Sequence, residues 1–102
     1  MIDLPPPHLA AIRRILAAHV PECEVRAFGS RVDSKAKAYS DLDLALVGPE
    51  RINLGRMGRL REALQESDVP IRVDLLDWHA IPESFRKVVE AKYEVLQPKS
   101  GS

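Results

Sequence analysis

The stretch DLDLALV, residues 41–47, begins with two acids that are separated by a leucine and is otherwise apolar. Such a run, ended by Gly48 and Pro49, predicts a β-strand. Because side chains alternate along a strand, Asp41 and Asp43 leave the same face, close together. Unpaired carboxylates at the edge of apolar surface are costly, and a divalent cation such as Mg²⁺ would compensate both charges. The stretch therefore predicts a strand with a metal site at its beginning.

A later strand carries a third acid. In residues 71–76, IRVDLL, every second side chain from Ile71 onward is apolar and points one way, while Asp74 points the other way. If this strand lies beside the first, with Asp74 level with Asp43, three carboxylates converge and can hold two cations, as two-metal nucleotidyl transfer requires. Asp74 is then the candidate general base. Alternatively, Asp74 is an edge-strand acid paired with Arg72.

A Gly-Ser turn precedes these acids. Gly29 and Ser30 follow a short predicted strand at residues 25–28, and ten residues separate Ser30 from Asp41. A glycine at a strand exit lets a phosphate approach the backbone, and a serine can donate both its hydroxyl and its N–H to phosphate oxygen. Basic side chains follow that can neutralise phosphate charge: Arg31, Lys35 and Lys37. A plain turn without a ligand is the alternative.

The rest of the chain alternates helical and strand patterns. Helices are predicted from the prolines at 5–7 through His19, from Leu54 to about Ser67, and from Pro82 to about Lys92. A short fourth strand is expected at residues 93–96. This order predicts an α/β or α+β domain with one sheet covered by helices. We expect a single domain over residues 1–97 and a flexible C-terminal tail at 98–102.

The composition excludes several function classes. Of the 102 residues, 45% are hydrophobic and 29% charged, which is typical of a globular protein. Fifteen basic and fifteen acidic residues give a formal net charge of zero, so a broad nucleic-acid surface is not expected. No apolar run approaches the roughly 20 residues that cross a bilayer. The first ten residues hold an acid and prolines where a secretion signal would be basic and then apolar, so we expect a cytoplasmic protein.

Residues outside these motifs have structural interpretations. Cys23 is the single cysteine, so it can form neither an intramolecular disulfide nor a clustered zinc site, and it is expected to fill apolar space near a strand. Trp78 directly follows the third strand and is expected to pack in the core rather than against adenine or a partner. The histidines lie on unrelated elements and indicate no metal site.

Together the motifs resemble the minimal nucleotidyltransferases of the DNA polymerase beta superfamily. The resemblance rests on FGSR at 28–31, the ten-residue gap, SDLDLAL at 40–46 and VDLL at 73–76. It implies a polymerase beta-like core with a small mixed sheet that binds ATP and Mg²⁺, with two ions expected. By the same resemblance, Asp41, Asp43 and Asp74 are the metal-binding and catalytic carboxylates, and Gly29, Ser30 and Arg31 contact the nucleotide phosphates. Residues 33–34, Asp-Ser, depart from the usual small residues and glycine, so the loop shape differs.

Family members this short are similar to antitoxins that are encoded beside a HEPN-type ribonuclease toxin. The resemblance therefore implies transfer of AMP from ATP to a hydroxyl, expected to be a tyrosine, of a cognate HEPN-type toxin, in a hetero-oligomer that neutralises the toxin. Two alternatives stay open: an antitoxin that blocks the toxin by binding alone, and a small-molecule nucleotidyltransferase, for which we expect the chain to be short of acceptor-binding surface. Tyr39, near the motifs, is a further candidate for self-modification.

Overall fold

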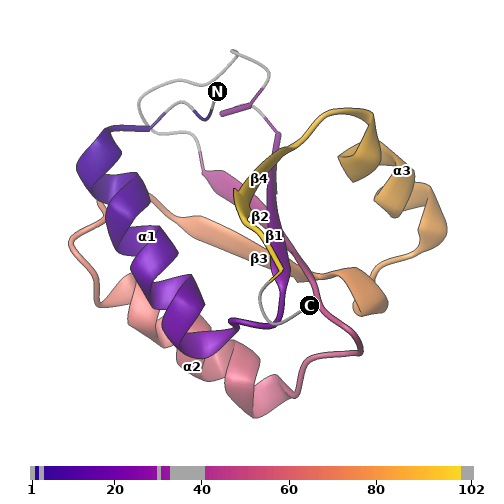
Figure 1. The fold of residues 1–102 in the computed structure, drawn as a ribbon, viewed down its shortest axis with the longest axis horizontal. Helices are drawn as coiled ribbons and strands as arrows, with labels where there is room; N and C mark the ends of the chain where they lie inside the picture. The colour runs from indigo at the N-terminus through magenta and orange to yellow at the C-terminus, as the bar shows by residue number, and fades with distance from the viewer. Residues whose placement is uncertain (1, 3, 30, 33–40, 100–102) are drawn as a thin grey trace.

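A four-stranded sheet forms the centre of the molecule (Figure 1). The structure is a computed structural model, and it describes residues 2, 4–29, 31–32 and 41–99. The elements in chain order are α1 (Pro6–His19), β1 (Glu24–Phe28), β2 (Leu42–Val47), α2 (Leu54–Gln65), β3 (Val73–Asp77), the 3-10 turn η1 (Trp78–Ala80), α3 (Glu83–Ala91) and β4 (Glu94–Gln97). In the described part of the chain, no helix combines the length and apolar character that crossing a membrane requires.

The sheet is mixed, with strand order β3-β2-β1-β4. β1 runs antiparallel to both of its neighbours, whereas β2 and β3 are parallel. Parallel neighbours need a crossover, and α2 supplies it between the two strands. The predicted fold class, one small mixed sheet flanked by helices, is confirmed.

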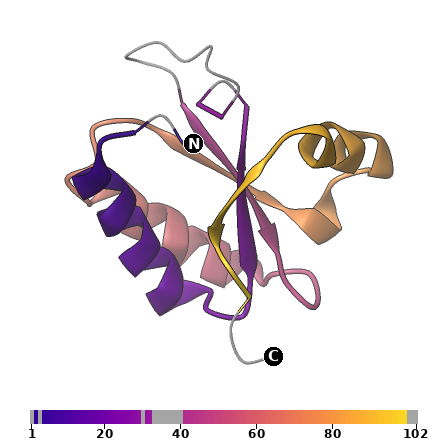
Figure 2. The ribbon, with the colours of Figure 1, turned by 45° about the horizontal axis from the view of Figure 1, so that its top comes forward.

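Helices cover the two faces of the sheet unequally (Figure 2). On one face, the even-numbered leucines of β2 pack with α1 and α2, for example against Ile12 and Leu60, in the larger core cluster. On the other face, α3 packs through Val89 onto Phe28 and Ala45 in a smaller cluster. The ring of Phe85 meets Phe28 edge-on, with 6.0 Å between the ring centroids. Side-chain alternation along β2 therefore separates a fully covered face from a partly covered one.

Local sequence accounts for most element boundaries. Prolines stand in the first turn of α1, where a missing N–H costs nothing, and the Asn53 side chain accepts a hydrogen bond from the Gly55 N–H to cap α2. The prediction for the third strand was displaced, because β3 begins at Val73 rather than Ile71 and extends to Asp77. The reason for the later end is the Asp77 carboxylate, which caps the η1 turn from the last position of the strand.

Candidate active site

Asp43 and Asp74 are direct neighbours across the parallel pair of β2 and β3. Leu42, Leu44 and Leu75 flank them in sequence and point into the large core, so both acids face the side of the sheet that α3 covers. Asp41 immediately precedes β2, two residues from Asp43. The predicted alignment of Asp43 with Asp74 is confirmed, while the roles assigned to the three acids stay predictions.

The charges of these acids act on one another. Burial of Asp43 raises the pKa of its carboxyl group above the usual value, and the neighbouring charges of Asp74 and Asp41 raise it further. The ionised form of Asp43 is thus disfavoured by the protein itself. A bound divalent cation would remove this penalty, so the donor chemistry fits a hard metal ion such as Mg²⁺.

Asp74 makes an ion pair with Arg72, whose Nε lies 3.0 Å from Oδ1 of the carboxylate. The Arg72 side chain is 77% exposed, and ion pairs of such exposure contribute little free energy. Within the described residues, no three Asp, Glu, His or Cys side chains are arranged to hold a metal ion. A metal site formed by the three aspartates therefore requires their carboxylates to come closer together than they lie here.

Gly29 lies against the Asp43 carboxylate at the end of β1. Its φ angle is +85°, a left-handed conformation that side chains rarely adopt, and a Cβ at this position would collide with Oδ2 of Asp43. The Val32 N–H donates to the Gly29 carbonyl at 3.0 Å and closes the turn. Position 29 therefore needs glycine for both its backbone conformation and its contact with the acid.

The remaining predicted phosphate-binding residues are only partly placed. Arg31 is buried, at 6% exposure, directly beyond the Gly29 turn. Its contact with phosphate stays a prediction. Several residues singled out in the sequence lie outside the described part of the chain: Ser30, the Asp-Ser pair at 33–34, Lys35, Lys37 and Tyr39.

Sequence reasoning missed a buried acid at the other end of β3 from Asp74. Asp77, 8% exposed at the end of β3, accepts the Ile52 N–H at 2.7 Å and the His79 N–H at 3.0 Å. Both carboxylate oxygens are thus used to hold the loop before α2 and the η1 turn. An acid directly before a turn, placed to accept the backbone N–H two residues further on, is a typical capping pattern, and it was the available signal.

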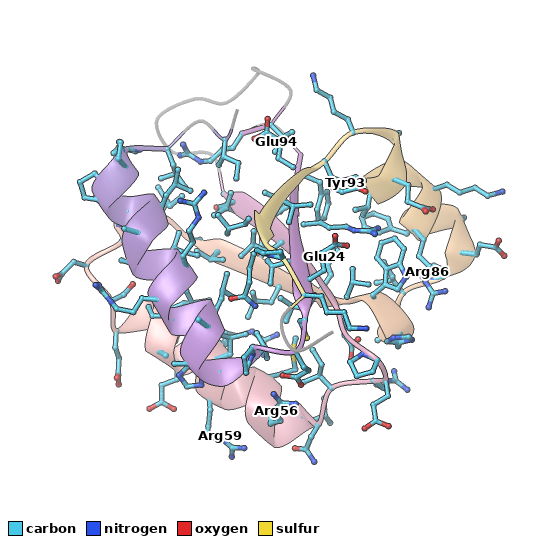
Figure 3. The ribbon with its side chains drawn as sticks, viewed as in Figure 1. Glu24, Arg56, Arg59, Arg86, Tyr93 and Glu94 are labelled. Atoms are coloured by element: carbon cyan, nitrogen blue, oxygen red, sulfur yellow. The ribbon has the colours of Figure 1, made fainter. Side chains whose placement is uncertain are left out.

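Trp78 packs as predicted, in the small cluster beneath α3. Arg26 lies between two rings, with its guanidinium carbon 5.0 Å from the Trp78 centroid and 4.5 Å from that of Tyr93. Glu24 fixes Arg26 through an ion pair of 2.7 Å, and Arg86 also approaches Trp78. Figure 3 labels Glu24, Arg86 and Tyr93 of this group. These contacts join the α3 region to β1. The guanidinium group of Arg26 already occupies the space between the two rings.

The fold and the paired acids beside a Gly turn define a nucleotidyltransferase, and two sequence comparisons agree. The model of the family described as polymerase beta, nucleotidyltransferase matches residues 11–100. The chain is also 48% identical over 98 residues to the probable protein adenylyltransferase MntA of Haemophilus influenzae, covering 96% of this chain and 86% of that protein. The chain therefore belongs to the polymerase beta nucleotidyltransferase family, as an MntA-like minimal member.

Solved structures share the fold at low sequence identity. A chain from a crystal structure of a toxin–antitoxin with AMP-PNP has a TM-score of 0.76 and 20% identity, covering 90% of this chain and 74% of that one. A chain from the complex of tri-AMPylated Shewanella oneidensis HEPN toxin with MNT antitoxin has a TM-score of 0.68 and 21% identity, covering 89% and 70%.

Proposed function

We propose that this chain is an antitoxin that transfers AMP from ATP to a hydroxyl of a HEPN-type toxin encoded beside it. The acceptor hydroxyl is assigned to a tyrosine, and the reaction to the cytoplasm. The support is the 48% identity to a probable protein adenylyltransferase and the shared fold with chains from toxin–antitoxin complexes, one of which contains an AMPylated toxin.

The alignment of Asp43 with Asp74 is the observation that carries this proposal. Asp41, Asp43 and Asp74 would hold Mg²⁺, and the bound metal would lower the pKa of the attacking hydroxyl and neutralise charge on the triphosphate. Burial of Asp43 and, after it, the charges of Asp74 and Asp41 raise the pKa of Asp43, so a bound cation would stabilise its ionised form.

The reaction assigns one task to each group of residues. The acceptor oxygen bonds to the α-phosphorus of ATP as the bond from that phosphorus to the pyrophosphate oxygen breaks. Asp74 accepts the hydroxyl proton once its carboxylate has left Arg72. Gly29 has no Cβ, so a phosphate group can approach the backbone at this turn. Gly29 follows β1, the strand beside β2, and lies against the Asp43 carboxylate.

Mass spectrometry tests the proposal. The protein, ATP, Mg²⁺ and the HEPN-type protein from the neighbouring reading frame are incubated, and the partner is analysed for an added adenylyl unit. We expect the addition with the native protein and none with the Asp41→Asn/Asp43→Asn variant. If the partner gains no mass but is still neutralised by that variant, the protein acts by binding alone. Transfer to small hydroxyl compounds without any protein partner would instead support a small-molecule nucleotidyltransferase.

A further inference from the structure

A pocket of about 480 Å³ opens beside Asp74 at the outer edge of β3. One wall is the second half of α2, and the other is the segment from Val69 into the start of β3. Because β3 is the last strand on its side of the sheet, this edge is not covered by another strand. The pocket thus joins an open strand edge to one of the three acids.

The lining of the pocket combines apolar surface with positive charge. Leu64, Val69 and Ile71 supply apolar surface, and the charged residues are Arg61, Arg72 and Asp74. Arg72 is already paired with Asp74. In the described part of the chain, Arg61 takes part in no hydrogen bond or ion pair. One guanidinium group is therefore available beside an apolar wall. A guanidinium pairs with a carboxylate or a phosphate, and because the proposed function assigns the ATP phosphates to the Gly29 turn, a carboxylate is the group expected here.

The pocket and the Gly29 turn lie on opposite sides of the acid pair. Gly29 follows β1, which borders β2 on one side, whereas the pocket borders β3 on the other. With the ATP phosphates assigned to the Gly29 side, the β3 edge is the free approach for the acceptor. An extended acceptor segment along this edge would carry its hydroxyl to Asp74 and place a neighbouring side chain in the pocket.

We propose that this pocket binds an acidic side chain next to the reacting hydroxyl of the acceptor protein, with Arg61 pairing to its carboxylate. This inference rests on the proposed function and names the feature by which the acceptor is selected. Arg61 is then a specificity-determining residue that acts on acceptor binding rather than on the chemical step.

The test compares Arg61→Glu with Arg59→Glu. Arg59 is an exposed arginine of the same helix that does not line the pocket, and it extends away from the sheet in Figure 3. The native protein and both variants are assayed with ATP, Mg²⁺ and the neighbouring HEPN-type protein as acceptor. KM for the acceptor, KM for ATP and kcat are measured separately, and acceptor affinity is also measured without ATP.

For Arg61→Glu we expect a rise of about tenfold or more in the acceptor KM and in the dissociation constant, with the ATP KM and kcat changed less than about threefold. Arg59→Glu should match the native protein, and Arg61→Lys should recover most of the loss. After the modified hydroxyl has been mapped, replacing the adjacent acceptor acid by lysine should restore binding to Arg61→Glu.

Three results overturn the inference while the native protein still transfers AMP. They are equal effects of Arg61→Glu and Arg59→Glu, an unchanged acceptor KM, and a raised ATP KM, which would place nucleotide in the pocket. Absence of transfer by the native protein would overturn the proposed function itself, and the inference with it.

Discussion

Asp74 and Asp77 lie three residues apart on β3 and have opposite surroundings. Asp74 lies beside Asp43 on the partly covered side of the sheet and forms an ion pair with the exposed Arg72. Asp77 is buried, and its two oxygens accept backbone N–H groups from Ile52 and His79. One strand thus carries an acid available for chemistry and an acid used for structure.

Substitution of the two acids by asparagine should separate these roles. Asp77→Asn leaves one oxygen acceptor and places an NH₂ group against a backbone N–H, so we expect a loss of about 1–3 kcal/mol in the free energy of unfolding. Asp74→Asn should change stability by less than about 0.5 kcal/mol and abolish AMP transfer. Urea unfolding measures the stability of each variant, and a transfer assay measures its activity. A stable Asp77→Asn protein would contradict the capping role.

Gly29→Ala should damage both stability and activity. The left-handed backbone and the collision with the Asp43 carboxylate predict a cost of about 1–3 kcal/mol, together with displacement of that acid. Gly58→Ala is the matched control, because a Cβ at this α2 position has no heavy atom within 4 Å. It should raise stability by up to about 1 kcal/mol and leave activity unchanged. Thermal unfolding measures the stability of both variants. Equal changes in melting temperature would contradict the argument from the contact between Gly29 and Asp43.

Asp43→Asn should make the metal-free protein more heat-stable at neutral pH. The pKa of Asp43 is raised in the folded state, so folding is penalised where the carboxyl is ionised and the penalty disappears as the pH falls and the group is protonated. The advantage of the variant should therefore shrink toward acidic pH. Mg²⁺ with ATP should raise the melting temperature of the native protein more than that of the variant. A pH-independent difference would contradict this explanation.

The ion pair of Glu22 with Arg56 predicts the opposite pH dependence. Two guanidinium nitrogens of Arg56 meet the carboxylate at 2.7 and 3.0 Å, and this hydrogen bonding lowers the pKa of Glu22. The stabilisation is present above the unfolded pKa and is lost as the pH falls through the folded one. Because each side chain is over a third exposed, Glu22→Gln should cost only about 0.5 kcal/mol at pH 7 and less under acid conditions. Urea titrations at several pH values measure the difference.

Cys23 should be unreactive in the native protein. Burial raises the pKa of its thiol to about 11, and the residue is fully buried against the core. Thiol reagents at pH 8 should therefore modify it only as fast as the protein opens. The check is the labelling rate, which should rise with urea. Rapid labelling without denaturant would contradict the buried position.

The alternating pattern of residues 41–47 and 71–76 was sufficient to predict two strands and the face on which each acid lies, whereas the alignment of Asp43 with Asp74 was expected only if the two strands were neighbours. Period-two alternation allows only one face for each acid once the leucines are buried. The end of β3 was missed because it depends on Asp77, whose partners Ile52 and His79 lie on two other segments. The position of Arg26 between Trp78 and Tyr93 was likewise unpredictable, since it arises only when α3 folds back onto β1.

The unequal covering of the sheet has a consequence for catalysis. The α3 cluster lies over Ala45 and Leu76, each two residues beyond an acid of the aligned pair, and the described residues place no helix over the acids themselves. The proposed reaction centre therefore lies on an open surface and is not enclosed by the described part of the protein. On the proposed function, an acceptor bound over the acids would exclude water only while it is bound, so hydrolysis of the nucleotide would depend on how long the acceptor stays bound.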